Sequence, residues 1–315
     1  MRIFLAPMEG VADNILRDVL TRVGGVDVCV SEFIRVSASV LPSRFFYRVV
    51  PELRQGGKTR AGVPVRVQLL GSDPHYLAAN AAKAVRLGAP AIDLNFGCPA
   101  PIVNRHCGGA ILLENPEALY QIVRAVRAAV PAKTPVTAKM RLGYHDTQKT
   151  LACAQALADG GADEIAVHAR TKAEGYRPPA HWEWIGAIRE VVQIPVIANG
   201  EIWQPSDWQT CQQASGAQDV MLGRGLVARP DLALALRAYA NHDSHFSTWT
   251  WAQILPLLMD FYQQVQQVVH PKHVAGRLKQ WLKYLTRHYV QATTLLAAIR
   301  TETHPQKVAD ALYLH

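Results

Sequence analysis

The stretch Ala91-Ile92-Asp93-Leu94-Asn95-Phe96-Gly97-Cys98-Pro99 joins a short apolar run to a loop that carries a cysteine. The apolar run is typical of a buried strand, and the glycine and proline beside Cys98 restrict the backbone around its thiol. In a barrel of parallel strands, reactive groups lie on the loops that follow the carboxyl ends of the strands. This stretch therefore predicts one strand of such a barrel with a functional loop after it.

Seven further runs of the same kind precede and follow it. The eight expected strands are Ile3–Ala6, Val28–Phe33, Val65–Leu70, Ala91–Asn95, Val136–Met140, Glu164–His168, Pro195–Asn199 and Asp219–Gly223. Helical patterns lie between most of them, for example over His75–Leu87, Pro116–Ala129 and Thr147–Asp159. This alternation predicts an α/β chain folded as a closed (β/α)8 TIM barrel, with an open doubly wound sheet as the alternative. The long gap between the second and third expected strands includes the region from Pro42 to Pro64, which is expected to hold a loop rich in Arg, Gln and Gly.

The composition changes near Asn241, and strand-like runs are missing from Trp249 onward. We expect a barrel over residues 1–241 and a small all-helical domain over residues 242–315. The expected helices of this tail are Trp251–Val268, His273–Val290 and Gln291–Arg300. Because no glycine- and serine-rich linker separates the two parts, they are expected to pack directly on each other.

The charge distribution points to a polyanionic partner. The chain carries a formal net charge of +8, and residues 261–301 contain six Lys or Arg and no Asp or Glu. Such a segment favours a surface that binds the phosphate backbone of a nucleic acid, although a solvated helix face is the structural alternative.

The cysteines and the apolar runs indicate the compartment. The five cysteines are odd in number and lack CxxC spacing, which predicts reduced thiols in the cytoplasm and no metal site. No apolar run reaches the roughly 18 residues of a membrane span, and the N-terminal run breaks at Pro7, too early for a secretory leader. We expect a cytoplasmic monomer without membrane contact.

Polar residues recur at the carboxyl ends of the expected strands. Glycines after the last two strands, together with Arg224, favour a bound phosphate group. Lys139 and His168 would then line the barrel mouth, where a cation stabilises a reduced flavin ring. Two other roles for Lys139 stay open. It could form a Schiff base, as in a lyase, or it could have a structural role only, in an ion pair at the barrel rim.

Cys98 is the candidate reactive thiol. A thiol with the ordinary pKa of about 8.5 is mostly protonated near pH 7, which suits a general acid as well as a nucleophile awaiting deprotonation. Cys107, in Arg105-His106-Cys107-Gly108-Gly109, is the rival, but it lacks the flanking proline.

These motifs resemble a known family. The chain resembles the tRNA-dihydrouridine synthases in Ala6-Pro7-Met8-Glu9-Gly10-Val11, Asn95-x-Gly97-Cys98-Pro99, His168-x-Arg170-Thr171 and Ile197-Ala198-Asn199-Gly200. Its Val65–Gly71 strand and Arg277–Leu282 tail segment look most like the bacterial DusC-like subfamily. The resemblance implies an FMN-dependent barrel with a helical RNA-binding domain, in which NADPH supplies electrons and one uridine of the tRNA D-loop, uridine 16, is reduced at its C5–C6 bond.

The resemblance also assigns roles to individual residues. Hydride would pass from FMN N5 to uracil C6, and Cys98 matches the catalytic proton donor to C5. Cofactor contacts are matched by Pro7, Met8, Glu9, Gln68, Lys139, His168, Asn199, Gly200, Glu201, Gly223 and Arg224. Contacts to tRNA are matched by Arg35, Asn95, Tyr176, Lys272, Arg277, Lys279 and Arg300.

Other interpretations of the chain stay open at this point. One is an FMN-dependent oxidoreductase acting on a small molecule, similar to a dihydroorotate dehydrogenase, although the acid-free tail disfavours it. Another is a lyase that forms a Schiff base on Lys139, and a third is an RNA-binding barrel without catalysis. The third leaves Cys98 and Lys139 unexplained.

Overall fold

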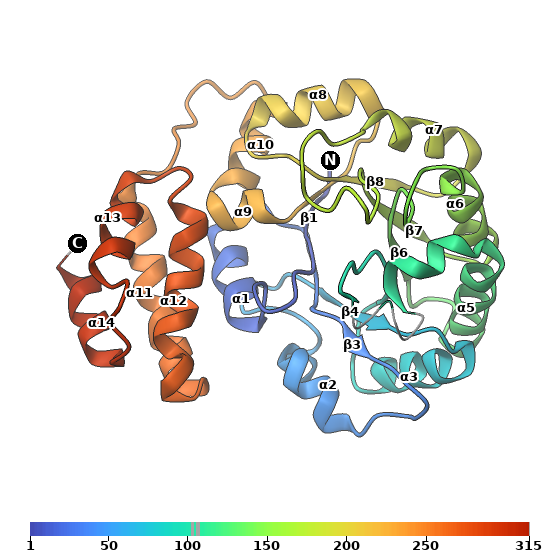
Figure 1. Ribbon diagram of the computed structural model, residues 1–315, viewed down its shortest axis with the longest axis horizontal. Helices are drawn as coiled ribbons and strands as arrows, with labels where there is room; N and C mark the ends of the chain where they lie inside the picture. The colour runs from blue at the N-terminus through green and yellow to red at the C-terminus, as the bar shows by residue number, and fades with distance from the viewer. Residues whose placement is uncertain (102–103, 105–107, 315) are drawn as a thin grey trace.

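Eight parallel strands close into a barrel in the computed structural model, which describes residues 1–101, 104 and 108–314 (Figure 1). The strands are β1 (Ile3–Leu5), β2 (Val28–Val30), β4 (Val65–Leu70), β5 (Ile92–Phe96), β6 (Val136–Arg141), β7 (Glu164–His168), β8 (Val196–Asn199) and β9 (Val220–Leu222). Strand β1 pairs with both β2 and β9, and β2 pairs with β4, so the sheet has no open edge there. The predicted TIM barrel is confirmed, and the open sheet is excluded.

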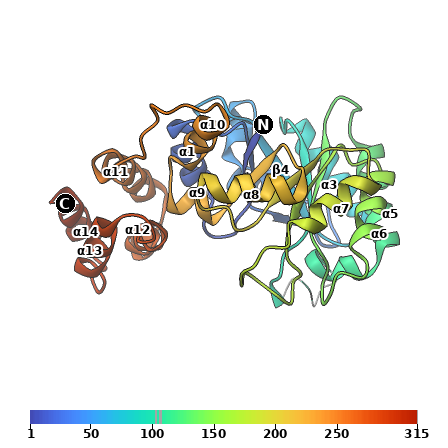
Figure 2. The same ribbon diagram turned by 90° about the horizontal axis from the view of Figure 1, so that it is seen from above.

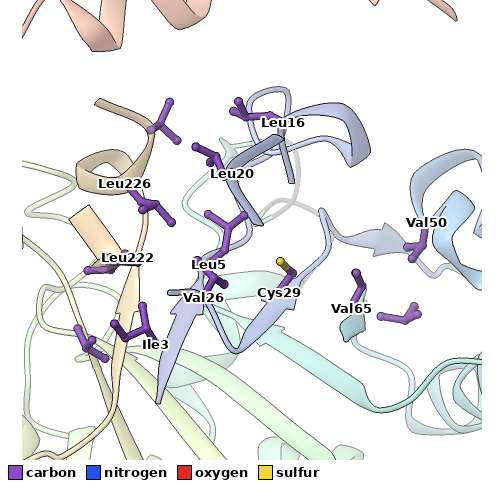
Figure 3. Close-up of a cluster of buried hydrophobic side chains, with 14 of the residues drawn as sticks. Ile3, Leu5, Leu16, Leu20, Val26, Cys29, Val50, Val65, Leu222 and Leu226 are labelled. Atoms are coloured by element: carbon purple, nitrogen blue, oxygen red, sulfur yellow. The ribbon is translucent and has the colours of Figure 1, made fainter. Parts of the chain in front are cut away.

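Helices surround the strands, as Figures 1 and 2 show. They are α1 (Asn14–Val23), α3 (Pro74–Arg86), α5 (Pro116–Ala129), α6 (Thr150–Asp159), α7 (Glu183–Val191), α8 (Pro205–Ser215), α9 (Arg224–Ala228) and α10 (Leu232–Ala240). Their apolar faces and the outward side chains of the strands form one buried core. Figure 3 shows part of it, where Leu16 and Leu20 of α1 lie near Leu5 of β1.

One expected strand of the second βα unit was wrong in its bounds. The run Val28–Phe33 ends as a strand at Val30, and a separate two-residue strand, β3 (Ile34–Arg35), pairs with β4. The chain leaves the ladder because the hydroxyl of Ser31 accepts the hydrogen bond of the Gln68 N–H (3.1 Å) that a backbone carbonyl would otherwise take.

The segment Pro42–Pro64 is helical in its first part, and the expected loop occupies residues 56–64. It contains α2 (Ser43–Val49) and the 3-10 helix η1 (Pro51–Gln55). Arg17 of α1, fully buried, pairs with Glu52 (2.9 Å) and donates to the Val49 carbonyl (3.0 Å). Because Arg17 is far in sequence from Glu52 and Val49, the local sequence pattern did not predict these two helices.

The barrel interior is layered. At the amino-terminal end of the strands, Arg66 forms a buried ion pair with Glu164 (2.7 Å). Above it lies a small apolar cluster of Phe4, Ala6, Val30, Ala166, Ile197 and Met221. Polar side chains occupy the carboxyl end, because alternate residues of each strand point inward and the last inward position of several strands is polar.

Four helices follow the barrel and lie to one side of it (Figures 1 and 2). They are α11 (Trp251–Val268), α12 (Pro271–Leu285), α13 (Val290–Ala298) and α14 (Pro305–Tyr313). Helix α11 is confirmed as predicted. The second helix begins at Pro271 and ends at Leu285, five residues before the predicted end, and α14 was not predicted. Among the described residues, no helix is long and apolar enough to cross a membrane.

The tail packs directly on the barrel. The buried Trp281 of α12 donates from Nε1 to the Val227 carbonyl of α9 (3.0 Å), and Arg277 pairs with Asp13 (2.6 Å). Arg22 of α1 also pairs with Asp260 of α11. These contacts bring α12 to the carboxyl-end rim of the barrel.

Candidate active site

A cavity of about 450 Å³ opens at the carboxyl ends of the strands, and its volume is typical of a ligand site. Residues that are far apart in the sequence meet there because parallel strands end at the same side of the barrel. The lining includes Cys98 and every predicted cofactor residue: Pro7, Met8, Glu9, Gln68, Lys139, His168, Asn199, Gly200, Glu201, Gly223 and Arg224. It also includes Asn95 and Tyr176, which were predicted to contact RNA.

A lysine and a histidine with lowered pKa values lie on neighbouring strands. Burial, and then the charge of Arg141, lower the pKa of Lys139 to about 8, so its ammonium group is mostly charged near pH 7. This ammonium donates to Asn199 Oδ1 (3.1 Å), and Asn199 Nδ2 donates to the Met221 carbonyl (2.8 Å). Burial and neighbouring cations hold the pKa of His168 well below its usual range, so its ring is neutral. The pair offers one cation and one neutral imidazole to a ligand.

The Cys98 loop is held by a side-chain turn. Asn95 Oδ1 accepts from the backbone N–H groups of Gly97 (3.0 Å) and Cys98 (2.9 Å), which fixes the loop directly after β5. Burial beside Leu70 and Phe33 raises the pKa of the Cys98 thiol above its ordinary value. Its thiol is therefore protonated near pH 7, as a proton donor requires. Cys107, the rival thiol, lies outside the described residues.

The part of the cavity formed by the loops after β8 and β9 suits an anion. Gly223 precedes α9, where the first N–H groups of a helix have no carbonyl partner within it, and Arg224 adds a guanidinium. Glu201 pairs with the fully buried Arg170 and, at 3.4 Å, with Arg224. Arg170 Nη1 is buried without a hydrogen-bond partner among the described residues. Backbone donors, a glycine and the Arg224 guanidinium, all at the cavity lining, fit a phosphate group.

Gly225 allows the last two loops of the barrel to touch. A Cβ atom at this position would lie 2.1 Å from the Ile202 carbonyl oxygen. We expect Gly225→Ala to force these loops apart, weaken cofactor binding and lower stability by about 1–3 kcal/mol. Thermal unfolding and cofactor titration measure both effects.

Gly276→Ala is the matched control for that substitution. Gly276 lies in α12, and a Cβ atom at this position would meet no other atom within 4 Å. Alanine there is expected to raise stability by about 0.5–1 kcal/mol. Equal melting temperatures for the two variants would contradict the steric argument.

Some lining residues were not predicted as site residues. They are Phe33, Arg141, Trp203 and Tyr284, among others. Arg141 could have been found, because it lies two residues after Lys139 and therefore on the same inward face of β6. Trp203 and Tyr284 carry no local signal. Tyr284 reaches the cavity from α12, and the Arg287 guanidinium lies 3.8 Å from the Trp203 ring centre.

The predicted RNA contacts outside the cavity are spread over the surface. Arg35, Lys272 and Arg300 are exposed. Arg277 instead pairs with Asp13 and donates to the Gly10 carbonyl (2.9 Å). Lys279 donates to the carbonyls of Arg300 (3.0 Å) and Glu302 (2.6 Å). The last two side chains therefore hold the tail together and onto the barrel, while their contact with RNA stays a prediction.

A metal centre was not expected. Within the part of the chain that the structure describes, no group of three or more His, Cys, Asp or Glu side chains is arranged to hold a metal ion.

Known proteins are similar to this chain over almost its full length. A family model described as dihydrouridine synthase (Dus) matches residues 4–312. The chain is 57% identical over 312 residues to the tRNA-dihydrouridine(16) synthase of Pseudomonas putida, covering 99% of this chain and 96% of that protein. It is 48% identical over 312 residues to the protein of the same name from Neisseria meningitidis serogroup B, covering 99% and 93%.

Solved structures show the fold alone. The histamine dehydrogenase of Rhizobium sp. 4-9 superposes with a TM-score of 0.58 at 14% identity, over 83% of this chain and 48% of that chain. A variant of NCR from Zymomonas mobilis superposes with a TM-score of 0.53 at 16% identity, over 76% and 86%.

Proposed function

This chain belongs to the dihydrouridine synthase family, and on that premise we propose that it reduces the C5–C6 bond of a uridine in tRNA to 5,6-dihydrouridine. The observation that carries the proposal is a protonated, buried thiol in the same cavity as a lysine cation and an anion-binding end. Reduction of a uracil double bond needs a hydride at one carbon and a proton at the other. Cys98 supplies the proton, at C5.

The cofactor is proposed to be FMN, reduced by NADPH. When bound, FMN supplies the hydride to C6 of the base. The glycine at position 223 and the Arg224 guanidinium suit its phosphate, while Gln68, Lys139 and Asn199 line the deeper part of the cavity. The positive charge of Lys139 stabilises negative charge on a bound ring, and Asn199 holds that ammonium in place.

The relatives support a position for the substrate uridine. Those named above are tRNA-dihydrouridine(16) synthases, and we propose uridine 16 of the D-loop as the target. A loop nucleotide leaves its stack at lower cost than one in a duplex, which lets the base enter the cavity. Asn95 and the half-exposed Tyr176 are proposed to contact the RNA beside this base.

The two parts of the chain are proposed to have different functions. Residues 1–241 form the catalytic barrel, and residues 242–315 form the tRNA-binding domain, with exposed Lys272 and Arg300 on its surface. We propose that the protein acts as a monomer in the cytoplasm, where its substrate is found.

The rate of flavin reduction is expected to fall as pH rises through about 8. The lowered pKa of Lys139 means that its cation is present below about pH 8 and is replaced by a neutral amine above it. Lys139→Arg keeps its charge and is expected to flatten this fall, whereas Lys139→Met is expected to be slow at every pH. Stopped-flow reduction by NADPH between pH 6 and 10 measures the profiles. Identical profiles for wild type and Lys139→Arg would remove Lys139 from this role.

The activity itself is tested by nucleoside mass spectrometry. Dihydrouridine-free tRNA is incubated with the purified protein and NADPH, and a two-hydrogen mass gain at one uridine is expected, with fragments mapping it to position 16. No gain, with FMN bound and NADPH still consumed, would favour reduction of a small molecule. A colourless protein that borohydride traps on Lys139 would favour the Schiff-base lyase.

A further inference from the structure

A buried chain of side-chain hydrogen bonds ends at the Cys98 loop. Asn95 Nδ2 donates to Gln68 Oε1 (2.8 Å), and Gln68 Nε2 donates to Asp93 Oδ2 (2.7 Å). Thr137 Oγ1 donates to the other carboxylate oxygen of Asp93 (2.6 Å). The strand register produces this row, because Gln68 of β4 lies beside Asp93 of β5, and Asp93 lies beside Thr137 of β6.

The direction of this chain is determined by chemistry. The N–H groups of Gly97 and Cys98 can only donate, so Asn95 must turn its oxygen toward them. Its nitrogen then faces Gln68, which must present its own oxygen. The nitrogen of Gln68 therefore faces residue 93, which must accept. A carboxylate meets that requirement in either orientation of its oxygens.

We propose that Asp93 is a positioning residue: by accepting from Gln68 it holds the side-chain amides of Gln68 and Asn95 in the orientation that turns the Asn95 oxygen toward the Cys98 loop. Asp93 is almost fully buried and does not line the cavity, so it acts through the two amides that do. It keeps Gln68 oriented as a donor at its nitrogen and Asn95 oriented as an acceptor for the loop. The importance of the loop for turnover rests on the proposed function, but the hydrogen-bond direction does not.

Substitutions at position 93 separate an acceptor from a charge. Asp93→Asn can place its oxygen toward Gln68 and its nitrogen toward Thr137, whose hydroxyl then donates to the Ile92 carbonyl (3.3 Å). Asp93→Leu has no acceptor. We expect Asp93→Asn to keep kcat within a few-fold, and Asp93→Leu to lower kcat by about 10- to 100-fold because the thiol is misplaced. The KM for tRNA is expected to stay within about twofold in both.

A pair of isosteric exchanges tests the direction itself. In Asn95→Asp, a carboxylate oxygen replaces the nitrogen that faces Gln68, so it meets the Gln68 oxygen and two acceptors face each other. If the Gln68 amide turns over instead, its oxygen meets the carboxylate of Asp93. In the double variant Asp93→Asn with Asn95→Asp, Gln68 turns over, accepts from the new amide at 93 and donates to the new carboxylate at 95. Every donor then has an acceptor, in the reverse direction, without a change in net charge.

The readouts do not depend on activity. We expect Asn95→Asp to lower Tm by about 3–6 °C, because buried acceptors without donors are costly, and to speed hydrogen exchange in the peptide containing Gly97 and Cys98. The double variant is expected to recover both values to near those of Asp93→Asn. Thr137→Val is the matched control, since it removes a donor to Asp93 but leaves the acceptor for Gln68; it should leave the exchange unchanged.

The outcomes distinguish the two proposals. Equal losses in Asn95→Asp and in the double variant, or an unchanged kcat in Asp93→Leu, would overturn the role of Asp93. Recovery of Tm and exchange in the double variant, in a protein that makes no dihydrouridine, would support the hydrogen-bond direction and reject the proposed function instead.

Discussion

Cys98→Ala is expected to lower the rate of dihydrouridine formation by about 10²- to 10⁴-fold, the usual contribution of a positioned general acid. The physical reason is the state of the thiol: burial raises its pKa, so it holds a proton at neutral pH. Alanine removes that proton but leaves the loop, because Asn95 binds the backbone of residue 98 and not its side chain. Single-turnover conversion of tRNA by the flavin-loaded, pre-reduced protein measures the loss.

Binding is expected to survive this substitution. The Kd for tRNA and the flavin content of Cys98→Ala should match those of the wild type. Cys153→Ala is the matched control: its buried thiol donates to the Leu113 carbonyl (3.1 Å) outside the cavity, so its loss should affect stability and not the chemical step. Full turnover in Cys98→Ala would remove Cys98 from the mechanism.

Trp281→Ala is expected to have the largest effect on stability, a loss of about 3–5 kcal/mol. The indole is buried, packs edge to face on Phe261 with ring centres 4.8 Å apart, and bonds the Val227 carbonyl of α9. Its removal leaves a cavity and an unpaired carbonyl at the contact between tail and barrel. Calorimetric unfolding should show a lower transition, and the KM for tRNA should rise because α12 is no longer held at the rim.

Trp281→Phe separates packing from hydrogen bonding. Phenylalanine keeps the six-membered ring and its packing but loses the indole N–H and the five-membered ring, so about 1–2 kcal/mol of the loss is expected to remain. If Trp281→Ala and the wild type unfold at the same temperature, Trp281 does not anchor the tail on the barrel.

The contacts of α12 also affect how tRNA binding should be tested. Arg277 carries an ion pair to Asp13 in the loop that follows β1, the loop that also supplies Met8 and Glu9 to the cavity. Its removal would disturb the interface as well as any contact with RNA. Lys272 is exposed, so its substitution is the cleaner probe of phosphate binding, read as a smaller dependence of affinity on salt.

The barrel and most of its mouth could be predicted from local sequence patterns. Strand-forming runs have a local signature, and parallel strands must end on one side, so polar residues after the strands were predicted to meet; the Cys98 loop, Lys139 and the glycines at 200 and 223 do meet in one cavity. Helix α11 was equally visible, because its apolar stripe and its ends are local features.

Long-range packing decides instead which polar side chains form hydrogen bonds and ion pairs within the protein and which face the cavity. The second βα unit depends on Arg17 reaching Glu52, and the placement of α12 depends on Trp281 reaching Val227, contacts between residues far apart in sequence. The hydrogen bonds that join Asp93, Gln68 and Asn95 likewise depend on the register between strands, which no single strand specifies. Burial then sets the protonation of Cys98 and Lys139, because desolvation is a property of the packed barrel and not of the residues alone.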